Sequence, residues 1–205
     1  MDGNNRWSIK RELSKYDSYK RGASKLVSLS NYIFKYTEIN TISAFALSKD
    51  NLQRSSKILN VIKKILFESL TQFENNKRNY DLVFIGDFNF LEDKIKKKIY
   101  SINKKQIFKK KLLIYLNYGG REDIQQAAKK FNNKNNFENN LLTSKYSEPD
   151  LLIRTGGYRR ISNFLLYQLA FTELFFLNKL WPDLSNADIK KIISQFNKIE
   201  RKFGK

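Results

Sequence analysis

The sequence contains no cysteine and no histidine among its 205 residues. Without cysteine the chain has no disulfides, thiolate nucleophiles or zinc ribbons. Without histidine it has no Ser-His-Asp triad and no imidazole acid–base group. Its chemistry must therefore depend on carboxylates, Arg, Lys, Tyr, Ser, Thr, Asn and backbone amides. Oxygen ligands of this kind suit a hard cation such as Mg²⁺.

Long apolar runs are also missing from the chain. No stretch reaches the ~18 apolar residues that a transmembrane helix needs, and no charged segment followed by an apolar one precedes the first motif. We therefore expect a cytoplasmic protein, and the sequence leaves a peripheral contact with a membrane open.

The charge balance is strongly basic. Lys and Arg number 39 against 20 Asp and Glu, which gives a formal net charge of +19 at pH 7. A basic chain attracts phosphate groups, so nucleic acid, anionic lipid and phosphorylated small molecules are all candidate partners. The lysines are scattered and accompanied by asparagines, which favours a compositional origin of the bulk charge. A nucleic-acid-binding module is the weaker alternative, because no stacking or groove-reading motif accompanies the charge, and we expect no nucleic acid partner.

Apolar runs alternate with longer amphipathic stretches along the chain. The length and a hydrophobic fraction of 41% suit one domain over residues 1–205. Strands are predicted over Thr41–Leu47, Tyr80–Ile85, Lys111–Tyr118, Asp150–Arg154 and the shorter Glu173–Phe176. Helices are predicted over Ser18–Tyr36, Asn51–Phe73, Arg121–Phe131 and Ser185–Phe203. This alternation predicts an α/β fold with a mostly parallel central sheet flanked by helices.

Glycine-rich turns follow three of the predicted strands, at Gly86, at Gly119-Gly120 and at Gly156-Gly157. In a parallel sheet, ligands bind beyond the carboxyl ends of the strands. These turns are therefore expected to share one rim of the sheet, which is the place to look for a binding site.

The first residues of the chain, Asp2 to Trp7, combine a carboxylate, a Gly-Asn-Asn turn and an arginine. A diphosphate bound to Mg²⁺ needs this set: an oxygen ligand for the cation, uncovered backbone N–H groups and a guanidinium for bidentate contacts. Taken alone, the segment is also typical of a disordered terminus.

A second segment places cations at the end of a strand. Arg154 ends a predicted strand, a Gly-Gly turn follows, and Arg159, Arg160 and Ser162 come next. Several cations and a hydroxyl in such a place form a phosphate site. The alternative is a surface turn with solvated arginines. That alternative is disfavoured because Arg154 directly follows an apolar run, where an unpaired charge would be partly desolvated.

Five segments occur in a distinctive order: Asp2–Trp7, Asn117–Arg121, Asp150–Leu166, Glu173–Phe176 and Trp181–Asp183. In this order they resemble the cis-prenyltransferase family, and the likeness continues to Glu200–Gly204. The resemblance implies a sheet flanked by helices with a hydrophobic tunnel. It also implies repeated cis condensation of isopentenyl diphosphate onto an allylic diphosphate, usually farnesyl diphosphate. The product would be a long-chain polyprenyl diphosphate such as undecaprenyl diphosphate.

The resemblance also implies roles for individual residues. Asp2 matches the family's catalytic aspartate, which coordinates Mg²⁺, and Glu173 matches a glutamate implicated in Mg²⁺ binding near a homodimer contact. The matches for the allylic diphosphate site are Gly3, Asn4, Asn5, Arg6, Trp7, Lys15, Tyr19 and Arg54. Asn51 matches a catalytic polar residue in the same loop as Arg54. Arg154, Arg160 and Ser162 match the grip on isopentenyl diphosphate, and a diphosphate oxygen or Asp2 is the expected proton acceptor.

Several positions depart from the family pattern. Asn5 replaces a glycine, Lys15 and Tyr19 stand where Arg and His are usual, Leu52 replaces a tryptophan, and Tyr158 replaces a glutamate. The family's first strand normally precedes the position of Met1, so either the chain starts late or the sheet lacks a central strand. The alternative function is a catalytically silent relative that supports a partner subunit.

The tunnel and the dimer contact can also be placed in outline. Following the family layout, the tunnel should lie between the Asn51–Phe73 helix and the strands that face it, with Leu47, Ile62, Leu66 and Val83 as candidate lining residues. A homodimer is expected because residues 164–177 are apolar almost without interruption around Glu173, and two-fold dimers are the commonest soluble assembly.

Overall fold

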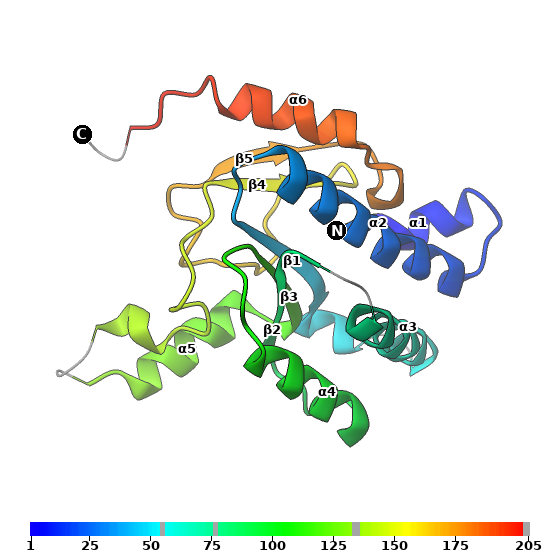
Figure 1. Ribbon diagram of the computed structural model, residues 1–205, viewed down its shortest axis with the longest axis horizontal. Coiled ribbons are helices and arrows are strands. Elements are labelled where there is room, and N and C mark those ends of the chain that lie inside the picture. The colour runs from blue at the N-terminus through cyan, green and yellow to red at the C-terminus, as the bar shows by residue number, and fades with distance from the viewer. Residues whose placement is uncertain (54–55, 76–77, 133–135, 203–205) are drawn as a thin grey trace.

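The computed structural model describes residues 1–53, 56–75, 78–132 and 136–202 (Figure 1). Its helices are α1 (Asn4–Ile9), α2 (Lys15–Tyr36), α3 (Ser56–Asn75), α4 (Asp93–Lys104), α5 (Gly120–Lys130) and α6 (Asn186–Phe196). Its strands are β1 (Thr41–Ser48), β2 (Asp81–Gly86), β3 (Lys111–Tyr118), β4 (Leu151–Arg154) and β5 (Glu173–Phe176). Short 3₁₀ helices are η1 (Lys49–Gln53), η2 (Phe137–Asn140) and η3 (Trp181–Asp183).

All five predicted strands are present and every pairing is parallel, which confirms the α/β fold with helices around a parallel sheet. The described strands form two sheets, β1–β3–β2 and β4–β5, rather than one. No described strand pairs with the second edge of β1 or with the second edge of β4. The absence of the family's first strand stays a prediction.

The helices differ from the predicted ones mainly at their ends. Because Ser14 caps α2 through a hydrogen bond from the Asp17 N–H, that helix starts earlier than predicted. Residues 49–53 form η1, so the next helix starts at Ser56. The capping box of Ser185 and Asp188 is confirmed, although α6 ends at Phe196. The helices α1 and α4 were not predicted.

Apolar residues cover both faces of the three-stranded sheet. One cluster contains Leu82, Phe84, Leu112 and Ile114, together with residues of α2, α3 and α4. A second cluster contains Val83, Ile85, Leu113 and Tyr115, together with Phe164 and Leu165. Successive side chains of a strand point to opposite faces, so the near-continuous apolar runs reflect burial on both sides.

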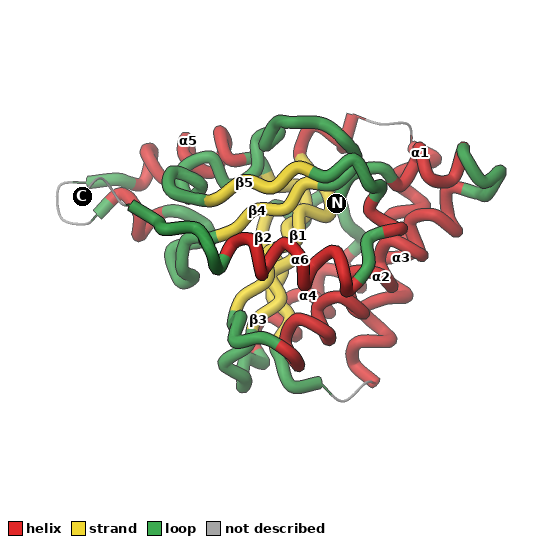
Figure 2. The backbone as a smooth tube through the Cα atoms, turned by 90° about the horizontal axis from the view of Figure 1, so that it is seen from above, coloured by secondary structure: helices red, strands yellow, loops and turns green. Residues whose placement is uncertain are grey.

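The elements are arranged so that β4–β5 extend the layer of the three-stranded sheet, as Figures 1 and 2 show. In Figure 1, α6 lies on the outer side of β4 and β5, and α2 and α3 lie beside one another. The parallel register puts the carboxyl ends of β1, β2 and β3 at one rim. The N-terminal segment reaches the carboxyl end of β4 by the contacts described next.

Candidate active site

The N-terminal loop is fixed to the end of β4 by hydrogen bonds between the Asp2 backbone and the Thr155 side chain. The Asp2 N–H donates to Thr155 Oγ1 at 3.0 Å, and the Thr155 hydroxyl donates to the Asp2 carbonyl at 3.0 Å. The same carbonyl accepts a bond from the Trp181 N–H at 3.0 Å. The loop is therefore held on two sides, and the Asp2 side chain is positioned by β4 and η3.

The Asp2 carboxylate lies between two arginines. Arg154 Nη2 donates to Asp2 Oδ2 at 3.0 Å, and Arg6 Nη2 lies 3.6 Å from Asp2 Oδ1. Arg6 also donates to the Gly156 carbonyl at 2.7 Å. Gly156 has φ +91°, and a Cβ there would lie 2.6 Å from Arg6 Nη2, so only glycine fits. The two sequence motifs thus meet at one strand end.

A strained turn brings Ser162 to the same cluster. Arg154 Nη1 donates to Ser162 Oγ at 2.7 Å and also to the Arg160 carbonyl. Ser162 and Asn163 have φ values of 53° and 62°, in the left-handed region. Such residues cost about 1–3 kcal/mol each and tend to mark functional sites. The turn is stabilised by the Gly120 N–H, which donates to the Asn163 carbonyl at 2.7 Å.

Three guanidinium groups surround one aromatic ring at this site. The Tyr158 ring centroid lies 4.3 Å from the Cζ atom of Arg160, 4.9 Å from that of Arg6 and 5.9 Å from that of Arg154. The negative face of an aromatic ring attracts cations at these distances. From the sequence, Tyr158 is identified only as a departure from the family pattern. The feature of the sequence that could have revealed this contact is an aromatic residue within a few positions of several arginines.

Polar contacts of Glu122, in α5, connect the start of this helix to η1 and to the turn at Asn163. Lys49 Nζ lies 3.3 Å from Glu122 Oε1, and Asn163 Nδ2 donates to Glu122 Oε2 at 3.2 Å. Burial would raise the pKa of Glu122, but the hydrogen bonds from the backbone, Asn163 and Lys49 outweigh burial and lower it. Asn51 lies half-buried in η1, two residues beyond Lys49. Arg54 lies outside the described residues.

An apolar cavity of about 210 Å³ opens beside this cluster, between α2, α3 and the sheet. Asn4 and Tyr19 line it at the end near the N-terminal loop, and Asn4 Oδ1 is buried without a hydrogen-bond partner in the described chain. Ile62 and Leu66, two of the four candidate tunnel residues, line the cavity. Leu47 and Val83 are not among its lining residues, and Val83 points to the opposite face of the sheet.

The remaining predicted residues of the allylic site lie around the Asp2 cluster rather than within it. Gly3, with φ +108°, is the residue before α1, and a Cβ there would lie 2.8 Å from Leu180 Cδ2. Asn5 and Lys15 are exposed. The Trp7 indole N–H donates to Asp183 Oδ1 at 2.7 Å, so this side chain links α1 to η3.

The structure does not bring Glu173, the second predicted metal ligand, to Asp2 within one chain. In the register of β4 and β5, Glu173 pairs with Leu151, whereas Arg154 pairs with Phe176. Three residues along a strand correspond to about 10 Å. Glu173 therefore lies at the far end of β4–β5 from the Asp2 cluster of the same chain.

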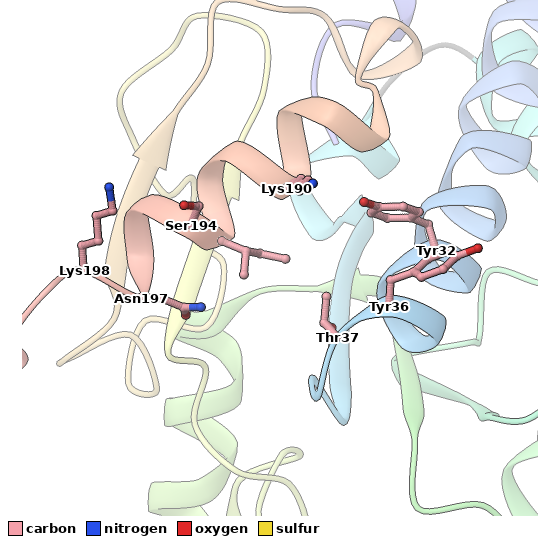
Figure 3. A pocket seen from close by; sticks show the side chains of 8 residues that line it. Tyr32, Tyr36, Thr37, Lys190, Ser194, Asn197 and Lys198 are labelled. Atoms are coloured by element: carbon pink, nitrogen blue, oxygen red, sulfur yellow. The ribbon is translucent and has the colours of Figure 1, made fainter.

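A second, more open pocket lies between the C-terminal parts of α2 and α6 (Figure 3). It has a volume of about 630 Å³ and is lined mainly by polar residues, among them Tyr32, Tyr36, Lys190 and Lys198. None of its lining residues belongs to the predicted site. The candidate site therefore remains the cluster around Asp2 with the cavity beside it.

Comparison with known proteins adds independent findings. The family described as "putative undecaprenyl diphosphate synthase" matches residues 1–204. The chain is 34% identical to a geranylgeranyl-diphosphate-specific tritrans,polycis-undecaprenyl-diphosphate synthase of Pyrobaculum aerophilum, over 100% of this chain and 93% of that protein. It is 35% identical to a farnesyl-diphosphate-specific ditrans,polycis-undecaprenyl-diphosphate synthase of Buchnera aphidicola, over 100% of this chain and 88% of that protein.

A solved structure has the same fold over the full length. The crystal structure of lavandulyl diphosphate synthase from Lavandula x intermedia, in complex with dimethylallyl diphosphate, matches with a TM-score of 0.87 and 27% identity. The match covers 100% of this chain and 95% of that chain. The fold, the ordered motifs and the full-length relatives agree, and the chain belongs to the undecaprenyl diphosphate synthase family of cis-prenyltransferases.

Proposed function

We propose that the chain condenses isopentenyl diphosphate in cis onto farnesyl diphosphate and makes a polyprenyl diphosphate of undecaprenyl length. The observation that carries the proposal is the cluster of Asp2, Arg6 and Arg154, which lies beside an apolar cavity. The cations suit diphosphates, and the cavity suits a growing hydrocarbon chain.

The two diphosphates would be held by different parts of the cluster. Arg6 and the N–H groups of the loop at Gly3, Asn4 and Asn5 would bind the allylic diphosphate and stabilise the charge that develops as it leaves. Arg154, Arg160 and Ser162 would bind isopentenyl diphosphate and hold it in line with the allylic carbon. Trp7 would act indirectly, through its contact with Asp183.

The donor set fits a magnesium ion that is shared with substrate. The described residues contain no group of three or more His, Cys, Asp or Glu side chains that could hold a metal alone. Mg²⁺ commonly binds through one or two carboxylates together with substrate phosphates. The Asp2 carboxylate would hold it here, and the ion would neutralise charge on the diphosphate.

Four further residues complete the proposed site. Tyr19 lines the cavity next to Asn4, so it would lie near the allylic end of the substrate. Lys15 and Arg54 would add charge for the allylic diphosphate, and Asn51 would act from η1 on the same rim. In the absence of histidine, a diphosphate oxygen or Asp2 would accept the proton that is lost.

The alternative of a catalytically silent subunit is not supported. The relatives that this chain matches over its full length are named as synthases. A silent relative would be expected to lose its catalytic aspartate and its diphosphate-binding arginines, but this chain keeps Asp2, Arg6 and Arg154.

We further propose that the protein is a homodimer in which Glu173 acts close to the partner's contact surface. Glu173 is half-buried and lies next to exposed Leu174 and Phe171 on the β5 side of the molecule. Sedimentation at micromolar concentration tests the assembly, and a species of monomer size would refute it. Glu173→Gln should weaken the Mg²⁺ dependence of activity without changing the sedimentation.

A cytoplasmic location with a peripheral membrane contact completes the proposal. Within the described residues, no helix has an apolar stretch long enough to span a bilayer. The substrates are water-soluble diphosphates or carry short chains, whereas the product is strongly apolar, so delivery to a membrane would follow synthesis.

The decisive experiment is a product assay. The chain is incubated with labelled isopentenyl diphosphate, Mg²⁺ and either farnesyl or geranylgeranyl diphosphate, and the products are sized. We expect a long-chain product from farnesyl diphosphate that disappears on chelation of Mg²⁺. A product made only from geranylgeranyl diphosphate would change the proposed substrate. No condensation with either primer would refute the proposed function.

A further inference from the structure

The last residue of α4 and the loop that follows it, residues 104–109, project an apolar side chain into solvent. Ile107 is 82% exposed, the largest exposure among the large apolar residues described, and its neighbour Phe108 is 39% exposed. The backbone N–H groups of both residues donate to Asp81 Oδ2 at 2.9 Å. Because Lys111 Nζ also donates to this oxygen at 2.6 Å, the loop is anchored and the exposure of Ile107 is built into the fold.

Lysines surround this apolar tip. Residues 94–111 contain nine lysines and no Asp or Glu, so this segment carries much of the chain's excess charge. Lys104, Lys105 and Lys109 are exposed, and none of them takes part in an ion pair in the described part of the chain. The tip therefore combines an apolar centre with a cationic border.

The loop lies at the end of the sheet away from the Asp2 cluster. Asp81 and Lys111 are the first residues of β2 and β3 and pair with each other, and the strands run from there toward the glycine-rich rim. Figure 2 shows loops at this end of β3. The candidate active site lies beyond the opposite ends of these strands.

The far part of the cavity approaches the same end of the sheet. Leu70 and Phe73, in the last two turns of α3, line the cavity, and Arg78 donates to the Phe73 carbonyl at 2.6 Å. Arg78 lies three residues before Asp81, the residue that anchors the loop. A chain that grew along the cavity from the Asp2 cluster would therefore advance toward the end where the loop projects.

We propose that residues 104–109 dock the protein on an anionic lipid surface, with Ile107 inserted among the lipids and Lys104, Lys105 and Lys109 on the headgroups. Each lysine near an anionic membrane strengthens binding by about fivefold, and an inserted apolar side chain adds the hydrophobic contribution. A nucleic acid would use the lysines but would leave Ile107 in water, so the apolar tip favours lipid. The purpose, delivery of an apolar product, rests on the proposed function.

The test is co-sedimentation of the full chain with vesicles. Vesicles of phosphatidylglycerol and phosphatidylcholine are compared with phosphatidylcholine alone, without substrate. We expect binding to the anionic vesicles only. Lys104→Gln/Lys105→Gln should weaken it about 25-fold, from the fivefold effect of each charge. Ile107→Ser should weaken it about tenfold, because an isoleucine loses its burial in lipid.

Matched variants control for general charge and apolarity. Lys129→Gln/Lys130→Gln removes two exposed lysines from the end of α5, and Leu142→Ser removes a side chain that is 42% exposed elsewhere. Both should bind vesicles like the unaltered chain. Thermal melting of each variant verifies that it is folded, which is expected because the substituted side chains are exposed.

Three results would overturn the proposal: no binding to anionic vesicles, equal loss in the control variants, or unchanged binding by Ile107→Ser. Tighter binding of a single-stranded oligonucleotide that is lost equally in the Lys104/Lys105 variant, with Ile107→Ser unaffected, would assign the loop to nucleic acid instead. Vesicle binding is measured without turnover, so its failure is distinguishable from a failure of the condensation assay.

Discussion

The three-stranded sheet and the β4–β5 pair are stabilised in different ways. Almost every residue of β2 and β3 is buried, whereas every residue of β4 is only partly buried. The end of β4 is held instead by backbone hydrogen bonds, such as those from the Gly156 and Gly157 N–H groups to the Lys179 and Leu177 carbonyls, both 2.8 Å. Stability is therefore concentrated in one sheet, and the charges that define the site are concentrated at the end of the other.

Shortening one apolar side chain in each sheet would test this difference in stability most strongly. Leu112 is fully buried in β3, so Leu112→Ala should lower the free energy of unfolding by about 2–5 kcal/mol. Leu152 in β4 is only half-buried, so Leu152→Ala should have a clearly smaller effect. Urea denaturation measures both variants. Equal losses would show that the β4–β5 pair contributes as much to stability as the larger sheet.

Asp2→Ala should greatly reduce catalysis without destabilising the fold. We expect turnover to fall by about 100-fold or more, as when a group that stabilises transition-state charge is removed. Isopentenyl diphosphate binding should persist, because Arg154 loses its carboxylate partner and remains available for phosphate. Steady-state kinetics and direct binding measure the two effects. Retention of a tenth of the activity would exclude Asp2 as the metal ligand.

Arg154→Gln should act on one substrate more than on the other. The KM for isopentenyl diphosphate should rise by the equivalent of about 1.5–3 kcal/mol, the usual value of a hydrogen bond to a charged group. Ser162→Ala, which removes the hydroxyl that Arg154 contacts at 2.7 Å, should have a smaller effect in the same direction. If the KM for the allylic diphosphate rose instead, the two diphosphate sites would be reversed.

Tyr158 offers a finer test of the same cluster. Tyr158→Leu removes the ring that three guanidinium groups approach, and it should raise the KM for isopentenyl diphosphate by the equivalent of about 1 kcal/mol, with kcat little changed. Tyr158→Phe keeps the ring and should behave like the unaltered chain. A defect in Tyr158→Phe would assign the effect to the hydroxyl group.

The smallest expected effect concerns α6, beside the β4–β5 pair. Lys179, followed by Ser185, lowers the pKa of Asp188 to about 2 from its ordinary 3.8. A carboxylate whose pKa is lower in the folded chain than in the unfolded chain stabilises the fold at pH values above its unfolded pKa. This contribution is lost as the pH falls from about 4 through 2. Asp188→Asn should therefore lower stability at pH 7 by about 1 kcal/mol. The difference from the unaltered chain should shrink below pH 4 and vanish below about pH 2, as denaturation at several pH values would reveal.

Burial and local chemistry made much of the fold predictable from sequence. Strands such as Lys111–Tyr118 were found because burial on both faces makes them continuously apolar, and Ser185 with Asp188 marked the start of α6. Helix α4 was not predicted, although Ile95, Ile99 and Ile102 stand at the i, i+4, i+7 spacing of a buried helix face and could have identified it. Division of the strands into two sheets depends on pairing between distant segments, which no local pattern specifies.

The candidate site was predictable where its motifs carry their own chemistry. Asp2, Arg6 and Arg154 were grouped by charge, glycine turns and family order, and the structure brings them together. The contacts of Tyr158 with Arg154 and Arg160 are local in sequence, but its contact with Arg6 could not be predicted, since Arg6 comes from the other end of the chain. The distance of Glu173 from Asp2 follows from the β4–β5 register, which sequence alone did not provide.

The contacts of the N-terminal loop also determine when the site can form during synthesis. Asp2 bonds to a residue 153 positions later, and Trp7 to one 176 positions later. Chains are made from the N-terminus at about 5–20 residues per second, so the loop leaves the ribosome well before its partners. The three-stranded sheet can assemble first, and the site is completed only when the segment around Asp183 has emerged. The contacts that hold the N-terminal loop therefore cannot all form before residue 183 has emerged.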